Sequence, residues 1–312
     1  MTSTKVKKNR LRDFASAITQ VWQICVYNFM SWKKNPRVFI TFGLAFVLCF
    51  LLTDKVVEFS YEYDTIMQAV EPFVWTFGDS NSILLASLLL ILLFSDMPFL
   101  GAGIPFYLMR TTRIRWMLGQ VLYICIAIFI YMLFVMLSSI IICMKNAFAG
   151  NMWSETGAIL GYSQAGKAIA VPSSVKTMEM STPYECMATI FLLMLLYTLL
   201  CVFIMLVMNL RKGKFWGIGS VFIFSIYGFL LNPQLFKDTL HLSDEQMYIA
   251  NVATGWASPL QHATYYMHNF GYDLLPRLKH TYMIYAVLIL LLFTSAFLAM
   301  RNYNFKFTGG LD

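Results

Sequence analysis

The residue spacing that most suggests chemistry is a partial phosphate-binding pattern. Gly161, Gly166 and Lys167 fit G-x-x-x-x-G-K. A phosphate-binding loop, however, also needs Ser or Thr directly after the lysine to hold magnesium, and a strand before the first glycine. Ala168 follows the lysine, and nothing before Gly161 resembles a strand. The pattern therefore does not predict a nucleotide site.

The histidines and cysteines do not form a recognisable metal or redox motif. All four histidines fall within 232–280, and His262 and His268 are six residues apart, which places them on different faces of a helix. We therefore expect surface histidines rather than a metal site. No cysteines are paired as C-x-x-C. Cys143 and Cys186 are near the same side of the predicted helical bundle, either as a disulfide or as two free thiols.

Protease motifs are also missing, since the sequence contains neither H-E-x-x-H nor G-x-S-x-G. No nucleophile, base and metal ligand converge in any segment. We therefore predict no catalytic residue, no metal site and no enzymatic activity in this chain.

The composition explains why so few residues could be reactive. Of 312 residues, 59% are hydrophobic and 12% are charged, which is about half the charged fraction of a soluble domain. A soluble chain of this size would need more polar surface to cover its core. The sequence therefore predicts an all-α integral membrane protein.

Six apolar stretches are long enough to cross a bilayer core, which takes about 20 helical residues. They lie at 36–53, 81–100, 117–143, 183–209, 215–231 and 281–300. Asn35 before Pro36 reads as a helix cap, Thr182 with Glu185 reads as a capping box, and Ser80 or Asn81 can cap the second helix. We found no cleavable signal peptide before the first stretch.

The basic residues indicate the orientation of these helices. The side that carries the N-terminus holds sixteen basic and three acidic residues, a net charge of +13, whereas the other side has a net charge of −6. Cytoplasmic loops of membrane proteins are enriched in Lys and Arg. We therefore predict a multi-pass protein of the cell (plasma) membrane with both termini in the cytoplasm. Basic residues at helix ends contact membrane lipid headgroups, so nucleic acid is not expected as a partner.

Three segments on the outer side are too long to be simple turns: 54–80, 144–182 and 232–280. The last is predicted to contain two short extracellular helices before helix six. One lies near 244–253, after the Ser243 and Gln246 capping box, and one extends over 259–270. Tyr265 and Tyr266 give the second helix an aromatic face, which we expect at the headgroup level of the outer leaflet. A plain surface helix is the alternative.

Residues 12–34 are predicted to form a helix lying along the cytoplasmic membrane surface. The apolar residues of one helical face are Phe14, Ile18, Val21, Trp22, Cys25 and Phe29. Basic residues flank this face at both ends, as expected on an anionic leaflet. The helix serves either as an anchor for the first membrane helix or as a signalling element.

The cytoplasmic connection between the second and third helices is the other basic segment. Its charged residues include Asp96, Arg110, Arg113 and Arg115. These arginines either anchor the membrane edge or form a docking surface for a soluble partner. None of the six stretches has a charge at its middle, although ion-coupled carriers place ionisable groups there. Uphill transport by this chain would therefore need energy from another subunit.

The six-helix layout, the N-terminal interfacial helix and the enlarged outer segment before helix six resemble the permease subunits of type-2 ABC exporters. The same helix layout is seen in the G subfamily of ABC transporters. The local match is Phe94-Ser95-Asp96-Met97-Pro98, followed by Tyr107-Leu108-Met109-Arg110-Thr111-Thr112-Arg113 and Trp116. This segment is similar to one common in bacterial permeases of the group.

The resemblance implies a cytoplasmic N-terminus with a connecting helix (1–35) and a six-helix permease domain (36–312). It also implies a cytoplasmic ATP-binding subunit that binds ATP and Mg, and a second permease copy or homologue. In the family, the segment 100–115 would be the coupling helix pressing on that ATPase. This favours docking for Arg110, Arg113 and Arg115, together with Asp96 shortly before the segment. The exported substrate would be amphipathic or peptide- or lipid-like. A non-transporting sensor or immunity subunit, and a membrane-embedded enzyme, are the alternatives.

Overall fold

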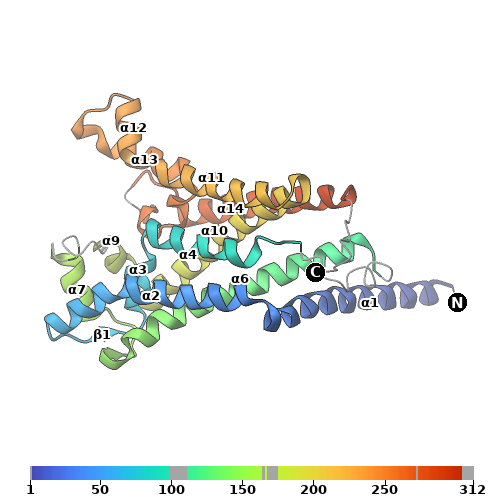
Figure 1. Ribbon diagram of the computed structural model, residues 1–312. Coiled ribbons are helices and arrows are strands. Elements are labelled where there is room, and N and C mark those ends of the chain that lie inside the picture. The colour runs from blue at the N-terminus through green and yellow to red at the C-terminus, as the bar shows by residue number, and fades with distance from the viewer. Residues whose placement is uncertain (1, 99–110, 164–165, 167–174, 272, 304–312) are drawn as a thin grey trace.

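The computed structural model describes residues 2–98, 111–163, 166, 175–271 and 273–303, with side chains from Asp13 onward (Figure 1). The described residues are almost entirely helical. The longer helices are α1 (Thr2–Met30), α2 (Pro36–Glu62), α4 (Ser80–Phe94), α6 (Arg113–Cys143), α10 (Pro183–Lys212), α11 (Lys214–Leu230) and α14 (Leu278–Arg301). The shorter helices are α3 (Glu71–Phe77), α7 (Glu155–Tyr162), α9 (Val175–Met180), α12 (Pro233–Thr239) and α13 (Met247–Ala257).

The remaining elements are short. Five 3-10 turns are η1 (Ser31–Lys34), η2 (Met144–Asn146), η3 (Asp244–Gln246), η4 (Gln261–Ala263) and η5 (Tyr265–Met267). Two two-residue strands, β1 (Met67–Gln68) and β2 (Ala147–Phe148), pair in parallel and join the outer segments 54–80 and 144–182.

Four of the helices are long and apolar enough to cross a membrane by themselves: α2, α6, α10 and α14. Two further spans are possible as bent pairs, with α3 and α4 meeting at 89° and α11 and α12 at 70°. The described chain therefore has four candidate spans, or six when each bent pair counts as one. Each of the six predicted stretches overlaps one of these helices, although α2 continues to Glu62, beyond the predicted limit of 53. The second helix ends at Phe94, before the predicted limit of 100.

The helix starts agree with most of the predicted caps. Asn35 accepts a hydrogen bond from the backbone of Arg37 at 3.1 Å, and Thr182 forms the predicted capping box with Glu185. The predicted cap of the second helix is wrong, because Asp79 performs this role by accepting from the Asn81 backbone at 3.1 Å. Asp79 has the extended backbone of an N-cap residue (φ −92°, ψ 143°), and its negative charge interacts favourably with the N-terminal end of the helix dipole.

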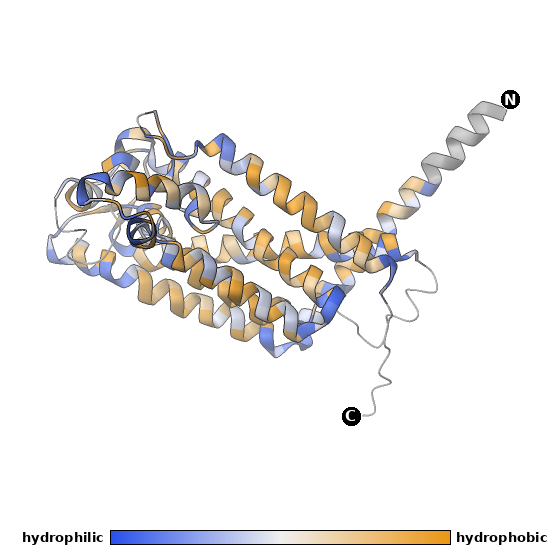
Figure 2. Cartoon of the chain, turned by 90° about the horizontal axis from the view of Figure 1, so that it is seen from above, coloured by the Kyte–Doolittle hydropathy of each residue, from blue (hydrophilic) through white to orange (hydrophobic). Residues whose placement is uncertain are grey.

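Helix α10 is the centre of the bundle. In the most apolar window of α10, 67% of residues are buried inside the protein, against 17% for α14. Apolar residues make up most of the long helices, as the hydropathy colouring in Figure 2 shows, and many of them face outward. Exposed examples are Phe39, Phe215, Ile223 and Leu290. An apolar exterior of this kind fits a lipid environment.

Helix α1 packs against α6, where Gly119 lets Ile24 approach closely. The predicted single apolar face is divided in the structure. Cys25 is buried against the bundle, whereas Phe14, Ile18 and Trp22 are exposed, Trp22 by 54%. The helix therefore has two apolar stripes, one packed on α6 and one that remains available to a membrane surface.

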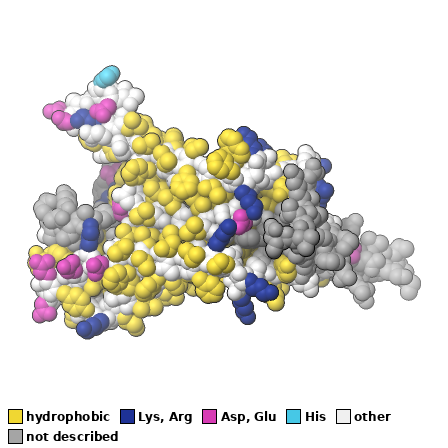
Figure 3. Space-filling view, in the orientation of Figure 1, with side chains coloured by type: hydrophobic (Ala, Val, Ile, Leu, Met, Phe, Trp, Pro, Cys, Tyr) yellow, Lys and Arg dark blue, Asp and Glu magenta, His cyan; other side chains and the backbone are white. Residues whose placement is uncertain are grey.

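The three long outer segments gather at one end of the molecule, and the N-terminus of α1 lies at the other (Figure 1). On the face shown in Figure 3, Lys and Arg side chains collect toward the end that carries α1, while most Asp and Glu side chains lie at the opposite end. The charge separation inferred from the sequence is therefore also a separation in space.

The outer segment 232–280 differs in part from the prediction. The Ser243 and Gln246 capping box is present and opens η3, which continues into α13. The helix predicted over 259–270 is wrong, because two 3-10 turns occupy that range, η4 and η5. The backbone of Thr264 is extended between them (φ −88°, ψ 120°). The hydroxyl of Ser258, directly before this range, donates to the Gly228 carbonyl at 2.8 Å.

Candidate functional site

Asp96 joins two membrane helices at the basic end of the bundle. Its carboxylate accepts hydrogen bonds from Arg37, in the first turn of α2, and from Lys214, which begins α11, the latter at 2.9 Å. Arg37 also donates to the Ser95 hydroxyl at 3.2 Å. We call Arg37, Ser95, Asp96 and Lys214 the Asp96 junction. It fixes the end of α4 directly before the segment 99–110.

Asn209 reinforces this junction from α10. Its side-chain amide donates to the carbonyl of Met97 at 2.7 Å. The α10–α11 turn is tight at this point, because a side chain on Gly217 would collide with the Asn209 carboxamide. The ends of α4 and α10 and the starts of α2 and α11 therefore meet within one polar cluster.

Arg113 and Arg115 make separate contacts on the other side of the same segment. Arg113, the first residue of α6, donates to the backbone carbonyls of Arg301 at 2.8 Å and Tyr303 at 3.4 Å. A guanidinium beside these carbonyls interacts favourably with the partial negative charge at the C-terminal end of α14. Arg115 donates to the Gln20 side chain of α1 at 2.9 Å. The two arginines thus connect α6 to α14 and to α1.

Of the four predicted docking residues, Asp96, Arg113 and Arg115 are described, and Arg110 lies outside the described residues. The described three bracket the segment 99–110, yet each engages a different helix. Their contacts within the chain show that they position helix ends, and nothing in these contacts tests a partner.

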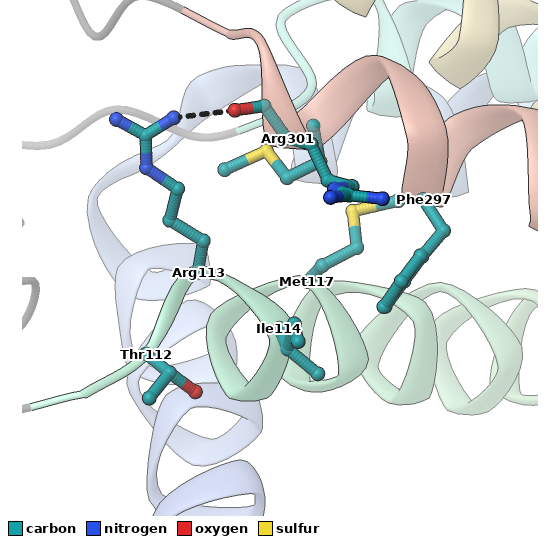
Figure 4. Close-up of a pocket in the computed structure, with 7 residues that line it drawn as sticks. Thr112, Arg113, Ile114, Met117, Phe297 and Arg301 are labelled. Atoms are coloured by element: carbon teal, nitrogen blue, oxygen red, sulfur yellow. Dashed lines mark hydrogen bonds between the residues drawn. The ribbon is translucent and has the colours of Figure 1, made fainter.

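A pocket of about 320 Å³ lies between the first turn of α6 and the last turns of α14 (Figure 4). Its lining comprises Thr112, Arg113, Ile114, Met117, Phe297, Met300 and Arg301. The Arg113 side chain reaches from α6 to the backbone of α14, and Ile114, Met117 and Phe297 form an apolar wall (Figure 4). A hollow with arginines at an apolar wall suits the edge of a membrane, where chains and headgroups meet.

Tyr265 and Tyr266 do not form an exposed aromatic face. Tyr265 is only 4% exposed and packs against Phe270 with ring centroids 5.1 Å apart, and Tyr266 is half-buried. Burial raises the pKa of each phenol to about 12. Lys176 of α9 pairs with Asp273 and lies 5.5 Å above the Phe270 ring. The tyrosine segment is therefore packed beneath α9.

The two central histidines meet, contrary to the expectation that they occupy different faces. His262 and His268 are both buried, at 4% and 0% exposure, and both contact the hydroxyl of Thr281 on α14. His262 Nδ1 lies 3.0 Å from Thr281 Oγ1, and His268 Nε2 lies 2.9 Å from the same oxygen. The extended residue Thr264 causes this arrangement, because it rotates η5 relative to η4.

Glu71 is a second buried group that sequence reasoning missed. It begins α3, is fully buried, and accepts hydrogen bonds from the Ser154 backbone amide at 2.6 Å and from the Ser154 hydroxyl. Ser154 in turn caps α7 by accepting from Gly157 at 3.0 Å. The carboxylate thus sits at the N-terminus of α7, where the helix dipole favours negative charge. Nothing in the sequence around Glu71 signals this burial.

All six cysteines are free thiols, so Cys143 and Cys186 are not bonded to each other. Among the described residues, no group of three or more His, Cys, Asp and Glu side chains is placed to hold a metal ion.

Comparison with known proteins does not identify the chain, because no protein-family model, curated protein or solved structure matches it.

Proposed function

We propose that this chain is the membrane permease subunit of an ATP-binding cassette transporter, powered by a separate cytoplasmic ATPase. The observation that carries the proposal is the Asp96 junction, which ties α2 and α11 to the end of α4 directly before the basic segment 99–113. A partner that pushes on this segment would act on several membrane helices together.

The proposed topology counts each bent helix pair as one span, giving six. The end that holds Asp96 and α1 faces the cytoplasm. The segments 54–80, 144–182 and 232–280 lie outside the cell, apart from α3 and α12, which belong to the bent pairs. The contrast between net charges of +13 and −6 supports this orientation. The chain then belongs to the plasma membrane, and α1 lies along its inner surface with Phe14, Ile18 and Trp22 toward lipid.

The contacts around the segment suggest how force from an ATPase would spread. Asp96 contacts α2 and α11, Arg113 contacts α14, and Arg115 contacts α1. The Arg37–Asp96 pair is 46% and 35% exposed, and exposed pairs of this kind contribute about 0–1 kcal/mol each. Such contacts orient helix ends and can also exchange partners during a transport cycle.

The proposal places ATP, Mg and all catalytic residues in the partner subunit. The core around α10 is filled with buried side chains, so the translocation path is assigned to the boundary with a second permease, either an identical copy or a homologue. The apolar exterior and the absence of a mid-span charge in the sequence favour export of an amphipathic, peptide-like or lipid-like substrate.

Mild detergent extraction tests the proposal. The tagged chain is purified from the membranes of its own cells, and phosphate release from ATP is measured in the eluate. We expect a co-purified protein that hydrolyses ATP, and we expect Arg110→Glu with Arg113→Glu to release it while the chain remains in the membrane. A charge pair broken in a docked interface costs roughly 2–5 kcal/mol.

Two controls are needed to interpret this experiment. Arg113→Glu alone also breaks the contact to α14, so Arg110→Glu is measured separately. An eluate without ATP hydrolysis contradicts the proposal, and an intact ATPase complex with the double variant shows that the arginines are anchors. Hydrolysis that no candidate substrate stimulates points to the sensor alternative.

A further inference from the structure

The buried contact between His262, Thr281 and His268 has more hydrogen-bond acceptors than protons when both imidazoles are neutral. His262 Nε2 faces the carbonyl of Trp256 at 3.2 Å. His268 Nδ1 faces the carbonyls of Thr264 and Tyr265 at 3.0 and 3.1 Å. A carbonyl oxygen only accepts, so each of these ring nitrogens carries a hydrogen.

A neutral imidazole has a hydrogen on one nitrogen only. The other two nitrogens, His262 Nδ1 and His268 Nε2, therefore present lone pairs, and both point at Thr281 Oγ1, at 3.0 and 2.9 Å. The Thr281 hydroxyl has one hydrogen and can donate to only one of them. The second nitrogen then meets an oxygen lone pair at hydrogen-bonding distance, which is unfavourable in a buried site.

We infer that His262, Thr281 and His268 form a binding site for one proton, shared by the two imidazoles through the threonine hydroxyl. With one added proton, every contact is satisfied: one imidazolium donates to Thr281 Oγ1, and the hydroxyl donates to the other histidine. Either histidine can be the imidazolium, because reversing the hydroxyl exchanges their roles.

The groups around the site limit it to a single proton. Lys176 of α9 adds positive charge near His268, although Asp273 pairs with that lysine. Two aromatic rings also lie nearby: the Tyr285 ring of α14 is 6.4 Å from His262, and the Trp256 ring, whose backbone carbonyl faces His262, is tilted at 5.9 Å from the ring of His280. Burial, the largest effect, lowers the pKa of His268 to about 4, and also lowers that of His262. A second proton would place two positive charges around one oxygen.

The site connects the outer segment to a membrane helix. His262 belongs to η4, His268 directly follows η5, and Thr281 lies in the first turn of α14. The added proton completes the hydrogen bonds that hold both 3-10 turns against α14. The acidity on that side of the membrane therefore controls how firmly the outer segment is attached.

Histidine NMR tests this inference and requires no partner subunit. The full chain, labelled with ¹⁵N-histidine and purified in detergent, is titrated from about pH 8 to about pH 3. This range contains the reference histidine pKa of about 6.5 and the burial-lowered pKa of about 4 for His268. Exposed His241 and His280 act as internal references, and His262→Asn and His268→Asn assign the buried signals. We expect the buried pair to take up one proton in total within this range.

Two substitutions separate the proton site from simple burial. Thr281→Val removes the hydroxyl but keeps the shape, and we expect it to lower the proton affinity of the pair at least tenfold. Thr281→Ser keeps the hydroxyl and should titrate as the wild type does. The inference is overturned if both buried histidines stay neutral to about pH 3 in the wild type, below the burial-lowered pKa of about 4 for His268. It is also overturned if Thr281→Val titrates unchanged. If the Thr281→Val variant does not fold, the number of protons taken up by the wild-type histidine pair still tests the inference.

Discussion

The Lys214 ammonium donates to the Asp96 carboxylate at 2.9 Å, although the two residues are 118 positions apart in the chain. This contact closes the end of α4 onto the start of α11, and Arg37 brings α2 to the same carboxylate. Neutralising Asp96 would therefore remove the ion pairs that both α2 and α11 make with the end of α4.

Asp96→Asn should leave stability almost unchanged but reduce coupling to an ATPase. Both ion pairs are partly exposed, with Lys214 64% and Asp96 35% accessible, so their loss costs about 1 kcal/mol or less each. In the proposed transporter, we expect ATP hydrolysis by the co-purified complex to fall by at least half. Asp13→Asn, at an exposed position of α1, is the control. Equal activity of the two variants would show that the junction does not transmit force.

Gly119→Ala should loosen the contact between α1 and α6. An added Cβ would lie 2.7 Å from Cβ and Cγ2 of Ile24 and 3.1 Å from the Val21 carbonyl, which are too close for side-chain movement to relieve. Overpacking of this kind costs about 1–3 kcal/mol. We expect a lower thermal unfolding midpoint in detergent. Gly219→Ala is the matched control, since nothing lies within 4 Å of its added Cβ, and alanine favours the helix.

Glu71→Ala should destabilise the packing between the outer segments 54–80 and 144–182. It leaves the buried amide and hydroxyl of Ser154 without their acceptor, at a cost of about 1–3 kcal/mol. Glu71→Gln retains one acceptor oxygen and should lose less. Thermal unfolding, together with proteolysis of the segment 144–182, measures both effects. If exposed Glu62→Ala is equally harmful, Glu71 is not the anchor of α7.

Single cysteines should report the proposed orientation. Cysteines at 62, 152 and 245 replace exposed residues and should react with a membrane-impermeant maleimide in intact cells. Cysteines at 13, 212 and 302 should react only after the cells are permeabilised. The native thiols add little background, because five are buried and Cys125 is half-buried. Reaction of any position from the wrong side would exclude the six-span topology.

Much of the helical framework can be read from the sequence because it depends on local properties. Long apolar stretches predict the helices α2, α6, α10 and α14, and short polar residues before proline predict the starts at Asn35 and Thr182. Caps and apolar length act within a few residues of the chain, so neighbouring letters are sufficient.

The errors arise where distant contacts decide the local structure. The pattern over 259–270 favours a helix, but Ser258 bonds to Gly228 of α11 and both histidines bond to Thr281 of α14. These side-chain contacts hold the two 3-10 turns on either side of the extended residue Thr264, and no local pattern encodes them. In the same way, the burial of Glu71 depends on the approach of Ser154, which is 83 positions away in the chain.

In the proposed topology, the 89° bend between α3 and α4 would limit how deep water can enter the protein from its acidic end. Helix α4 has 15 residues, a length of about 22 Å, against a hydrocarbon core of about 30 Å. Helix α3 lies at nearly a right angle to α4 with all seven residues buried, so it covers the outer end of α4 rather than lengthening it. Because α3 is itself covered by the segments that Glu71 and Ser154 join, opening that cover in the proposed permease would admit water to the outer end of α4.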